Sequence, residues 1–417
     1  FFFKQKTAYE ILTCDWSSDV CSSDLVERAM DLLAAELGMD PVDLRRRNLI
    51  PADAFPYETV VGETYDVGDY TRALDVALEL ADVPARRLDQ AARRQRGDRL
   101  ALGIGVAVYV EITGFSPEFG SVEVHDDGSA TVLTGTSPHG QGHATSWAMI
   151  AQDRLGIPMD KVTLVWGDTD LVPASPGWHS GLTTQLQGGA LCSAADKLRA
   201  ELLSRAATAL AVDASTLTIK DGVISARDNP VKRTTFAALA KANPGGVIKM
   251  PGRAVHPGSI GRSLNRGIGA CFAEVEVDTW TGNWRFARVA YCSDTGNVIN
   301  PLLGSADMHG AVSESLQLST EAIPWDREFS GTRHYGVGYL SYRLPTIYEM
   351  PELTNVFINS LEPRWFFGCK GFAETAIGAP PGTLANAIYN ACGVRLDRKS
   401  TRLNSSHMSE SRMPSSA

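Results

Sequence analysis

Residues 270–292 read ACFAEVEVDTWTGNWRFARVAYC, a stretch rich in apolar, β-branched and aromatic residues. Such composition is typical of short β-strands. Three other stretches share it, namely ALGIGVAVYVEI (101–112), SVEVHDDGSATVLTG (121–135) and KVTLVWGD (161–168). The sequence therefore predicts that a strand-rich region begins near residue 100.

Two stretches between these strands have helical character, at 143–155 and at 189–211. Strands and helices thus alternate, but without the regular period of repeated β-α-β units. This pattern favours an α+β domain, with mixed sheets and packed helices, over a doubly wound domain.

The region before the strands is predicted to be mainly helical. An apolar stripe at helical spacing predicts a helix over 26–37. Asp40 followed by Pro41 is typical of an N-cap and a first helical residue, so a second short helix is expected there. A third helix is predicted over 69–81. Residues 84–99 contain six arginines and little apolar content, which indicates a solvated helix or a linker at a domain boundary.

Both ends of the chain resemble translated sequencing adapters. Residues 397–417 begin with DRKSTRLNSSH, which is the translation of a common short-read adapter. Residues 4–11 and 14–25 resemble the complementary adapter. A signal peptide is the alternative for the N-terminal end, but residues 1–25 lack a basic start, an apolar core and a small-residue cleavage site. We therefore expect both ends to be unstructured and residues 26–396 to carry the fold.

Charge and cysteine usage argue against several classes of protein. The chain has 39 Lys and Arg against 48 Asp and Glu, which does not indicate a basic nucleic-acid-binding surface. No run approaches the roughly 18 continuous apolar residues of a membrane helix. The cysteines between the two ends are widely spaced and form no CxxC pair, which fits reduced thiols better than disulfides or an iron–sulfur site. These features predict a soluble cytoplasmic protein.

The first segment suited to chemistry is HGQGH, where a strand is expected to end and a helix to begin. Gly140 and Gly142 permit close backbone approach, and free N–H groups at the helix start suit an anionic or polar ligand. An ordinary strand-to-helix turn is the more common meaning of such a sequence. His139 and His143 lie four residues apart, but without a third ligand nearby they do not indicate zinc.

The second segment, residues 167–190, is a long loop that opens a helix of small residues. Loops of this length inside a domain are often functional. Thr183 and Thr184, with the adjacent backbone amides, could bind a phosphate or the polar edge of a pterin. A capped helix start is the more common alternative for such a loop.

The third segment, CKGFAETAIGAPPGTLANAIYNACG, holds Glu374 among apolar neighbours. Such a setting disfavours the charged form of a carboxyl group and suits a general base. A glutamate that caps a helix or forms a salt bridge is an equally good explanation of this residue alone.

In their order and spacing, these segments resemble the second half of the molybdopterin-binding large subunit of the xanthine dehydrogenase, aldehyde oxidase and aerobic carbon monoxide dehydrogenase family. The resemblance is carried by collinear landmarks: MDLLAAELGMDPVDLRRRNLI, FPYETVVGETYDVGDYTRAL, GIGVAVYVE, HGQGH, GDTDLVP, GLTTQLQGGA, AEVEVDTWTG, VINP and KGFAETAIGAPPGTLANAIYNA. It implies that residues 26–98 are the C-terminal tail of a first molybdopterin-binding domain with a linker. Residues 99–396 would then form the second molybdopterin-binding domain.

The resemblance also implies roles for individual residues. Glu374 matches the glutamate of the family's KGxGE motif, the base that takes a proton from the water-derived nucleophile, although Ala373 stands where glycine is usual. Gln141 would supply amide hydrogen bonds to the cofactor. The residues implied in cofactor binding are Gly140, Gln141, Gly142, Ser180, Gly181, Leu182, Thr183 and Thr184.

Other positions depart from the family's pattern. Tyr109 and Val110 stand where a Phe-Thr pair is common at the substrate wall, which predicts a different substrate pocket. Ala306 and Asp307 replace the usual Gly-Gln pair after VINP, so that one amide contact to the cofactor is not expected.

The implied function is a molybdenum hydroxylase that oxidises an aldehyde or an N-heterocycle carbon with water-derived oxygen. The cofactor would be molybdenum-molybdopterin or its cytosine dinucleotide form, and the fragment alone is expected to be inactive. Two electrons must leave, which implies [2Fe-2S] and FAD subunits or domains as partners, in a dimer of heteromers. The alternatives are a molybdopterin-binding subunit without catalysis and a carbon monoxide dehydrogenase-like large subunit. A serine or cysteine hydrolase is disfavoured, because no GxSxG elbow or Cys/His motif is present.

Overall fold

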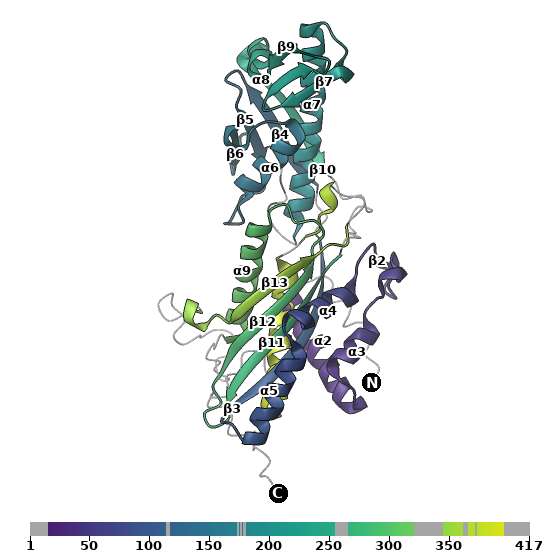
Figure 1. The fold of residues 1–417 in the computed structure, drawn as a ribbon, viewed down its shortest axis with the longest axis vertical. Coiled ribbons are helices and arrows are strands. Elements are labelled where there is room, and N and C mark those ends of the chain that lie inside the picture. The colour runs from purple at the N-terminus through teal and green to yellow at the C-terminus, as the bar shows by residue number, and fades with distance from the viewer. Residues whose placement is uncertain are drawn as a thin grey trace.

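The protein forms two lobes stacked along its long axis (Figure 1). The computed structural model describes residues 16–113, 117–172, 175, 177, 181–254, 266–320, 345–361, 366–371 and 373–395. Within these residues, no helix is long and apolar enough to cross a membrane.

The lower lobe in Figure 1 is built on a four-stranded sheet in the order β13-β12-β11-β3. Its strands are β3 (Leu100–Ile112), β11 (Arg266–Asp278), β12 (Trp284–Asp294) and β13 (Glu352–Ile358). The first three pair antiparallel, whereas β13 joins β12 in parallel, so the sheet is mixed. Alternate side chains of β11 enter two different apolar clusters, since both faces of the sheet are covered.

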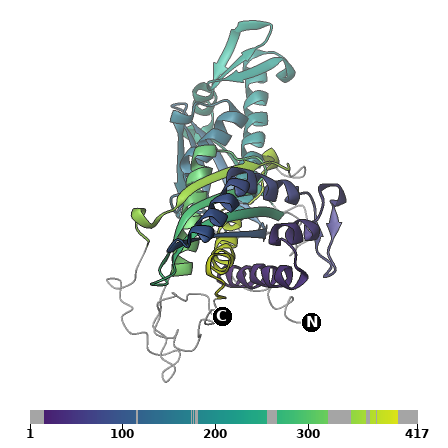
Figure 2. The same ribbon diagram turned by 60° about the horizontal axis from the view of Figure 1, so that its bottom comes forward.

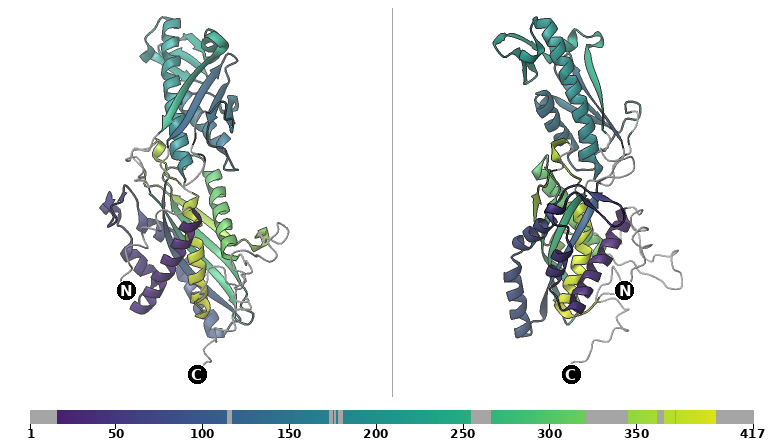
Figure 3. Two further views of the ribbon diagram at one scale, coloured as in Figure 1. Left: turned by 180° about the vertical axis from the view of Figure 1, so that it is seen from behind. Right: turned by 90° about the vertical axis from the view of Figure 1, so that its right-hand side faces the viewer.

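Helices cover both faces of this sheet. On one face α4 (Tyr70–Leu80) packs against β11 and β12, and on the other lie α9 (Pro301–Thr320), α10 (Glu374–Ile377) and α11 (Ala379–Cys392). Figures 2 and 3 show α2 (Trp16–Leu37) beside α11. The remaining helices and short strands of this lobe are α3 (Pro41–Asn48), α5 (Val83–Arg96), β1 (Tyr57–Glu58) and β2 (Thr64–Tyr65).

The upper lobe has a second four-stranded sheet in the order β10-β4-β5-β6. The long helix α7 (Gly188–Leu210) packs against it, and α6 (His143–Leu155) packs beside α7. A small three-stranded sheet and α8 (Phe236–Lys241) lie at the far end of the lobe (Figure 1). The strands are β4 (Glu118–His125), β5 (Ala130–Thr134), β6 (Val162–Trp166), β7 (Leu217–Lys220), β8 (Val223–Ala226), β9 (Asn229–Thr235) and β10 (Val247–Ala254).

The predicted α+β class with mixed sheets is confirmed. The predicted boundary near residue 99 is not a break in the packing. Residues 84–99, interpreted as a solvated helix or linker, form most of α5, and Gln90 Nε2 donates to the Leu102 carbonyl of β3 at 2.8 Å. The region 26–98 thus shares the core of the lower lobe.

The expectation that residues 1–25 are unstructured is wrong for residues 16–25, which form the start of α2. Ser23 and Asp24 are buried, and the Asp24 Cα lies 3.5 Å from the position that a Cβ on Gly382 of α11 would take. Once a helix has formed, each further residue adds a hydrogen bond at little extra cost, so α2 extends beyond the apolar stripe. Residues 1–15 and 396–417 lie outside the described residues.

Helix α11 packs so closely on β3 that two of the strand's residues must be glycine. A Cβ on Gly105 would lie 2.0 Å from the Thr383 carbonyl oxygen, and one on Gly103 would lie 2.0 Å from the Ala387 carbonyl oxygen. Both contacts involve backbone atoms, which no change of rotamer can move. The helix that carries the end of the Glu374 segment is thereby held against the sheet.

We expect Gly105→Ala to lower the free energy of unfolding by about 1–3 kcal/mol, the usual cost of overpacking a core. Chemical denaturation of the full-length protein measures this loss. Gly310→Ala is the matched control, because a Cβ at this helical position meets nothing within 4 Å and is expected to be neutral or slightly stabilising. Equal unfolding midpoints for the two variants would contradict the close packing.

Candidate functional site

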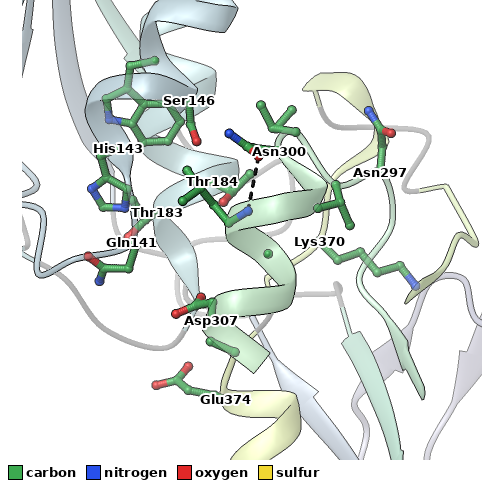
Figure 4. A pocket seen from close by; sticks show the side chains of 17 residues that line it. Gln141, His143, Ser146, Thr183, Thr184, Asn297, Asn300, Asp307, Lys370 and Glu374 are labelled. Atoms are coloured by element: carbon green, nitrogen blue, oxygen red, sulfur yellow. Dashed lines mark hydrogen bonds between the residues drawn. The ribbon is translucent and has the colours of Figure 1, made fainter. Parts of the chain in front are cut away.

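A cavity lies where the two lobes meet, and residues from both lobes line it (Figure 4). Its walls come from α6 and the turn before it, from the π-helical turn that precedes α7, from α9 with the segment before it, and from α10 with the loop that opens it. The lining residues are Gln141, His143, Ser146, Trp147, Gly181, Thr183, Thr184, Asn297, Val298, Ile299, Asn300, Leu303, Gly304, Asp307, Lys370, Ala373 and Glu374.

The first wall is the HGQGH turn. Gly140 and Gly142 have φ of 110° and 76°, a region of backbone conformation that glycine adopts without strain. Gly142 is the N-cap of α6 and provides no side-chain cap, so the first backbone N–H groups of the helix receive no hydrogen bond from it. The Gln141 side chain lies at the cavity, where its Oε1 accepts a hydrogen bond from the His139 backbone N–H. The turn therefore places the Gln141 amide and the first residue of α6, His143, at the cavity, whereas Gly140 and Gly142 are not among its lining residues.

His143 and Trp147 stack on each other behind this turn, with ring centroids 5.2 Å apart. Burial lowers the pKa of His143 to about 4, because the charged imidazolium is poorly solvated there. The ring is therefore neutral at physiological pH. Its Nδ1 and the Trp147 Nε1 are buried and have no hydrogen-bond partner among the described residues.

The second wall is a π-helical turn, Thr183–Gln187, that leads into α7. Such turns occur frequently at functional sites. Gly181 before it has a φ of 59°, again in the region that favours glycine. Thr183 Oγ1 is buried without a partner among the described residues. A buried polar atom without a partner is costly, which indicates that a ligand completes its hydrogen bonding.

The third wall carries Glu374 as the first residue of α10. Ala373 before it is the helix N-cap with φ 75° and ψ −62°, a strained conformation for a residue with a Cβ. Glycine adopts such a positive φ without strain, so this geometry suits the glycine of the motif that the sequence resembles. Strain of this kind is characteristic of functional loops.

Lys370 fixes the start of the same loop. Its ammonium group is fully buried and donates to Asp294 Oδ2 at 2.9 Å, to Ser360 Oγ at 2.8 Å and to the Val67 carbonyl at 3.1 Å. These acceptors come from the end of β12, the residues after β13 and the segment before α4. The loop before Glu374 is thus anchored to three parts of the lower lobe.

The structure brings together most of the residues that the sequence singled out. Gln141, Gly181, Thr183, Thr184 and Glu374 line one cavity, which confirms the predicted convergence of three segments far apart in the chain. Their chemical roles stay predictions.

The remaining predicted residues take other places. Leu182 is fully buried, so it can offer a ligand only its main chain. Ser180 lies outside the described residues. Tyr109 and Val110 do not line the cavity: the Tyr109 ring packs on Gly378 and its hydroxyl bonds to Glu111, while Val110 packs against the cluster beneath α4. Successive residues of β3 point to opposite covered faces of the sheet, which places both side chains away from this cavity, and their role at a substrate wall stays a prediction.

Sequence reasoning missed several lining residues. His143 was considered only as a zinc ligand, and among the described residues no group of three His, Cys, Asp or Glu side chains could hold a metal ion. Asn300 belongs to the VINP stretch, which was quoted as a landmark but given no role, and Asn297 directly precedes it. Lys370 could have been noticed from the sequence, because it is the lysine of the KGxGE motif that ends in Glu374.

The donor set decides which cofactor fits this cavity. Hydroxyl, imidazole and indole groups with unsatisfied hydrogen bonds, beside the Gln141 amide, suit a polar heterocycle. Among the described residues no side-chain cluster could hold a metal by itself, so a metal would have to arrive bound to such an organic ligand. These residues fit the molybdopterin that the sequence predicted.

Comparison with known proteins agrees with this fit. The family model "Molybdopterin cofactor-binding domain" matches residues 76–351. The carbon monoxide dehydrogenase large chain of Hydrogenophaga pseudoflava is 32% identical over 388 residues, which cover 88% of this chain and 47% of the relative.

Two solved structures share the fold. Carbon monoxide dehydrogenase from Oligotropha carboxidovorans has a TM-score of 0.79 at 28% identity, covering 90% of this chain and 49% of that one. Quinoline 2-oxidoreductase from Pseudomonas putida 86 has a TM-score of 0.78 at 26% identity, covering 89% and 49%. The chain thus spans about half the length of each of these relatives. It belongs to the family of molybdopterin cofactor-binding domains found in the large subunits of molybdenum hydroxylases.

Proposed function

We propose that the parent protein of this chain is a molybdenum hydroxylase that oxidises an aldehyde or an N-heterocycle carbon with oxygen derived from water, and that Glu374 is its general base. The observation that carries this proposal is the presence of Glu374 in one cavity with Gln141, Thr183 and Thr184. A carboxylate next to hydroxyl and amide donors can hold a proton while the donors fix the ligand.

Each group of the cavity then has a task. Thr183 and Thr184 hydroxyls and the Gln141 amide bind the polar edge of the cofactor, and the neutral His143 ring offers one donor and one acceptor. The bound cofactor supplies a Lewis acid and a two-electron acceptor. Glu374 accepts the proton that the water-derived nucleophile loses as its oxygen attacks the substrate carbon.

The electrons must then leave the cavity. The five cysteines between residues 192 and 392 are free and mostly buried, and among the described residues no cluster of His, Cys, Asp and Glu could hold a metal centre. We therefore propose that the parent passes two electrons to a [2Fe-2S] subunit or domain and onward to FAD, in a larger assembly that is a dimer of heteromers.

A carbon monoxide dehydrogenase-like large subunit is the second candidate. It is favoured by the 32% and 30% identity to the large chains of two carbon monoxide dehydrogenases. A cofactor-binding subunit without catalysis is the third candidate, because Ala373 and Asp307 depart from the family's pattern at the cavity.

The test uses the full-length parent purified with its partners. We expect it to contain molybdenum and a pterin, and to reduce a dye acceptor with aldehydes or N-heterocycles in the absence of carbon monoxide. Turnover with carbon monoxide alone would favour the second candidate, and bound pterin without any turnover the third. A folded parent that contains neither molybdenum nor pterin would contradict all three.

A further inference from the structure

Helix α2 carries an apolar stripe that the lower lobe does not cover. Its members recur at spacings of four, three and four residues, which places them along one face of the helix. They are Val26, Met30, Leu33 and Leu37. Met30 is partly buried, whereas the other three are 56%, 46% and 55% exposed in chain order. A stripe of this kind normally faces a protein core, but here it faces outward from the part of the chain that the structure describes.

The face of α2 that packs on the lobe is polar instead. Glu27 is buried, its Oε2 accepts from Arg45 Nε at 2.7 Å, and its backbone carbonyl accepts from Asn386 Nδ2 at 3.1 Å. Asp31 Oδ1 accepts from the same guanidinium group at 2.7 Å. Arg45 is only 1% exposed, so turning the apolar stripe inward would leave a buried charge without its counterions. These contacts with α3 and α11 therefore hold the stripe on the outside.

The composition of the stripe suits a permanent contact. Single exposed apolar residues are ordinary on protein surfaces, whereas contiguous ones mark a surface that another element covers. Ala29 and Leu32 are also exposed and extend the apolar surface around the helix, and none of these six residues is charged. Permanent interfaces have such apolar cores, whereas transient interfaces are about as polar as the rest of a protein surface. A permanent occupant therefore fits α2 better than a transient partner.

The relatives have additional chain that could supply this occupant. They are matched over 47% to 49% of their length, so that about half of each lies beyond the part that this chain matches. An apolar segment of the same polypeptide is a permanent neighbour, because it cannot dissociate from the molecule. It is also present at a high effective concentration.

We propose that the stripe of α2 is an internal docking surface of the parent protein, and that its occupant is an apolar face of the parent chain outside this sequence. The contact braces more than α2. Helix α2 packs on α11, and α11 directly follows α10, the helix that begins with Glu374 (Figure 3). The inference concerns assembly and does not depend on the proposed chemistry.

Thiol labelling of the full-length parent tests the occupant. Leu33→Cys places a thiol in the stripe, and the unsubstituted parent gives the background. Each protein is treated with a maleimide, both native and in urea, and the modified peptide that contains residue 33 is quantified by mass spectrometry. We expect native Leu33→Cys to react about a hundredfold more slowly than the same variant in urea, because a covered thiol reacts only when the region opens locally.

Leu88→Cys is the matched control, because Leu88 is a helical leucine of α5 that is 74% exposed. Its native and unfolded rates should agree within about tenfold. Val26→Cys repeats the measurement at a second place on the stripe with a smaller change of side chain, so a Leu33→Cys variant that fails to fold does not prevent the test. Native rates close to the unfolded rates at the stripe overturn the inference.

The source of any protection is then identified. Protection that persists on about a hundredfold dilution, and after removal of any partner subunits, supports the parent's own chain as the occupant. Protection lost on dilution indicates a second copy, and protection lost with the partner subunits indicates one of them. Either of these two results overturns the proposed occupant. Pterin content and turnover do not enter the measurement, so failure of the proposed function leaves the inference standing.

Discussion

Glu374→Gln is expected to lower the turnover of the full-length enzyme by about 10²-fold or more while the bound molybdenum and pterin stay at the wild-type level. The size follows from the loss of general-base catalysis, which typically contributes 10²- to 10⁴-fold. Glutamine keeps the shape and the hydrogen-bonding capacity of the side chain but cannot accept the proton. Steady-state turnover with a dye acceptor, together with molybdenum and pterin content, gives both quantities.

Glu79→Gln serves as the control for the change of charge, because Glu79 is an exposed acid of α4 that does not line the cavity. It should leave turnover within twofold of the wild type, as expected for a surface substitution that touches no functional group. Near-normal turnover of Glu374→Gln would leave Glu374 as a structural residue at the start of α10. Loss of pterin from Glu374→Gln would instead indicate a role in cofactor binding.

Local hydrogen bonds explain which helices the sequence predicted correctly. Asp40 was expected to cap a helix beginning at Pro41, and in the structure its Oδ1 accepts from the Val42 backbone N–H at 2.8 Å. Asp69 was expected to open another helix and caps α4 in the same way, through the Arg72 N–H. Such a cap involves residues two or three positions apart, so the sequence contains all of it.

Features set by distant contacts could not be predicted in this way. The parallel pairing of β13 with β12 joins segments about 60 residues apart, and no local pattern specifies its register. Tyr109 and Val110 pack against the apolar clusters on opposite faces of the sheet, and both faces are covered. Alternation of side chains along β3 therefore does not tell which face meets a ligand. Several members of the site, such as Gln141, Thr183 and Glu374, were predictable, whereas its geometry was not, because three segments had to be brought together by the fold.

Lys370 shows the same limit most clearly. In the sequence it is a lone lysine in a loop, whereas in the structure it forms a fully buried ion pair with Asp294, a residue 76 positions earlier. No pattern of nearby residues indicates that pairing. The cost of removing one partner is nevertheless predictable from burial, because a charge left alone in the interior has neither water nor a counterion.

We therefore expect Lys370→Met to lower the free energy of unfolding of the full-length protein by about 3–5 kcal/mol, the usual cost of removing one partner of a buried ion pair. Adding Asp294→Asn should recover part of this loss, since the uncompensated charge is then gone. Arg288→Met, which breaks a pair with Glu352 at the neighbouring strand, is the control. Its partners are 28% and 64% exposed, and water replaces the lost contact, so the cost should stay below about 1 kcal/mol.

Urea unfolding of the wild type, both single variants and the double variant measures these energies. If Lys370→Met unfolds no earlier than Arg288→Met, the ammonium group is not the anchor of the Glu374 loop. If Lys370→Met is destabilised and the double variant is no better, the lysine acts through its bonds to Ser360 and Val67 rather than through Asp294. Recovery in the double variant would instead identify the buried charge of Asp294 as the reason that this loop requires a lysine at its start.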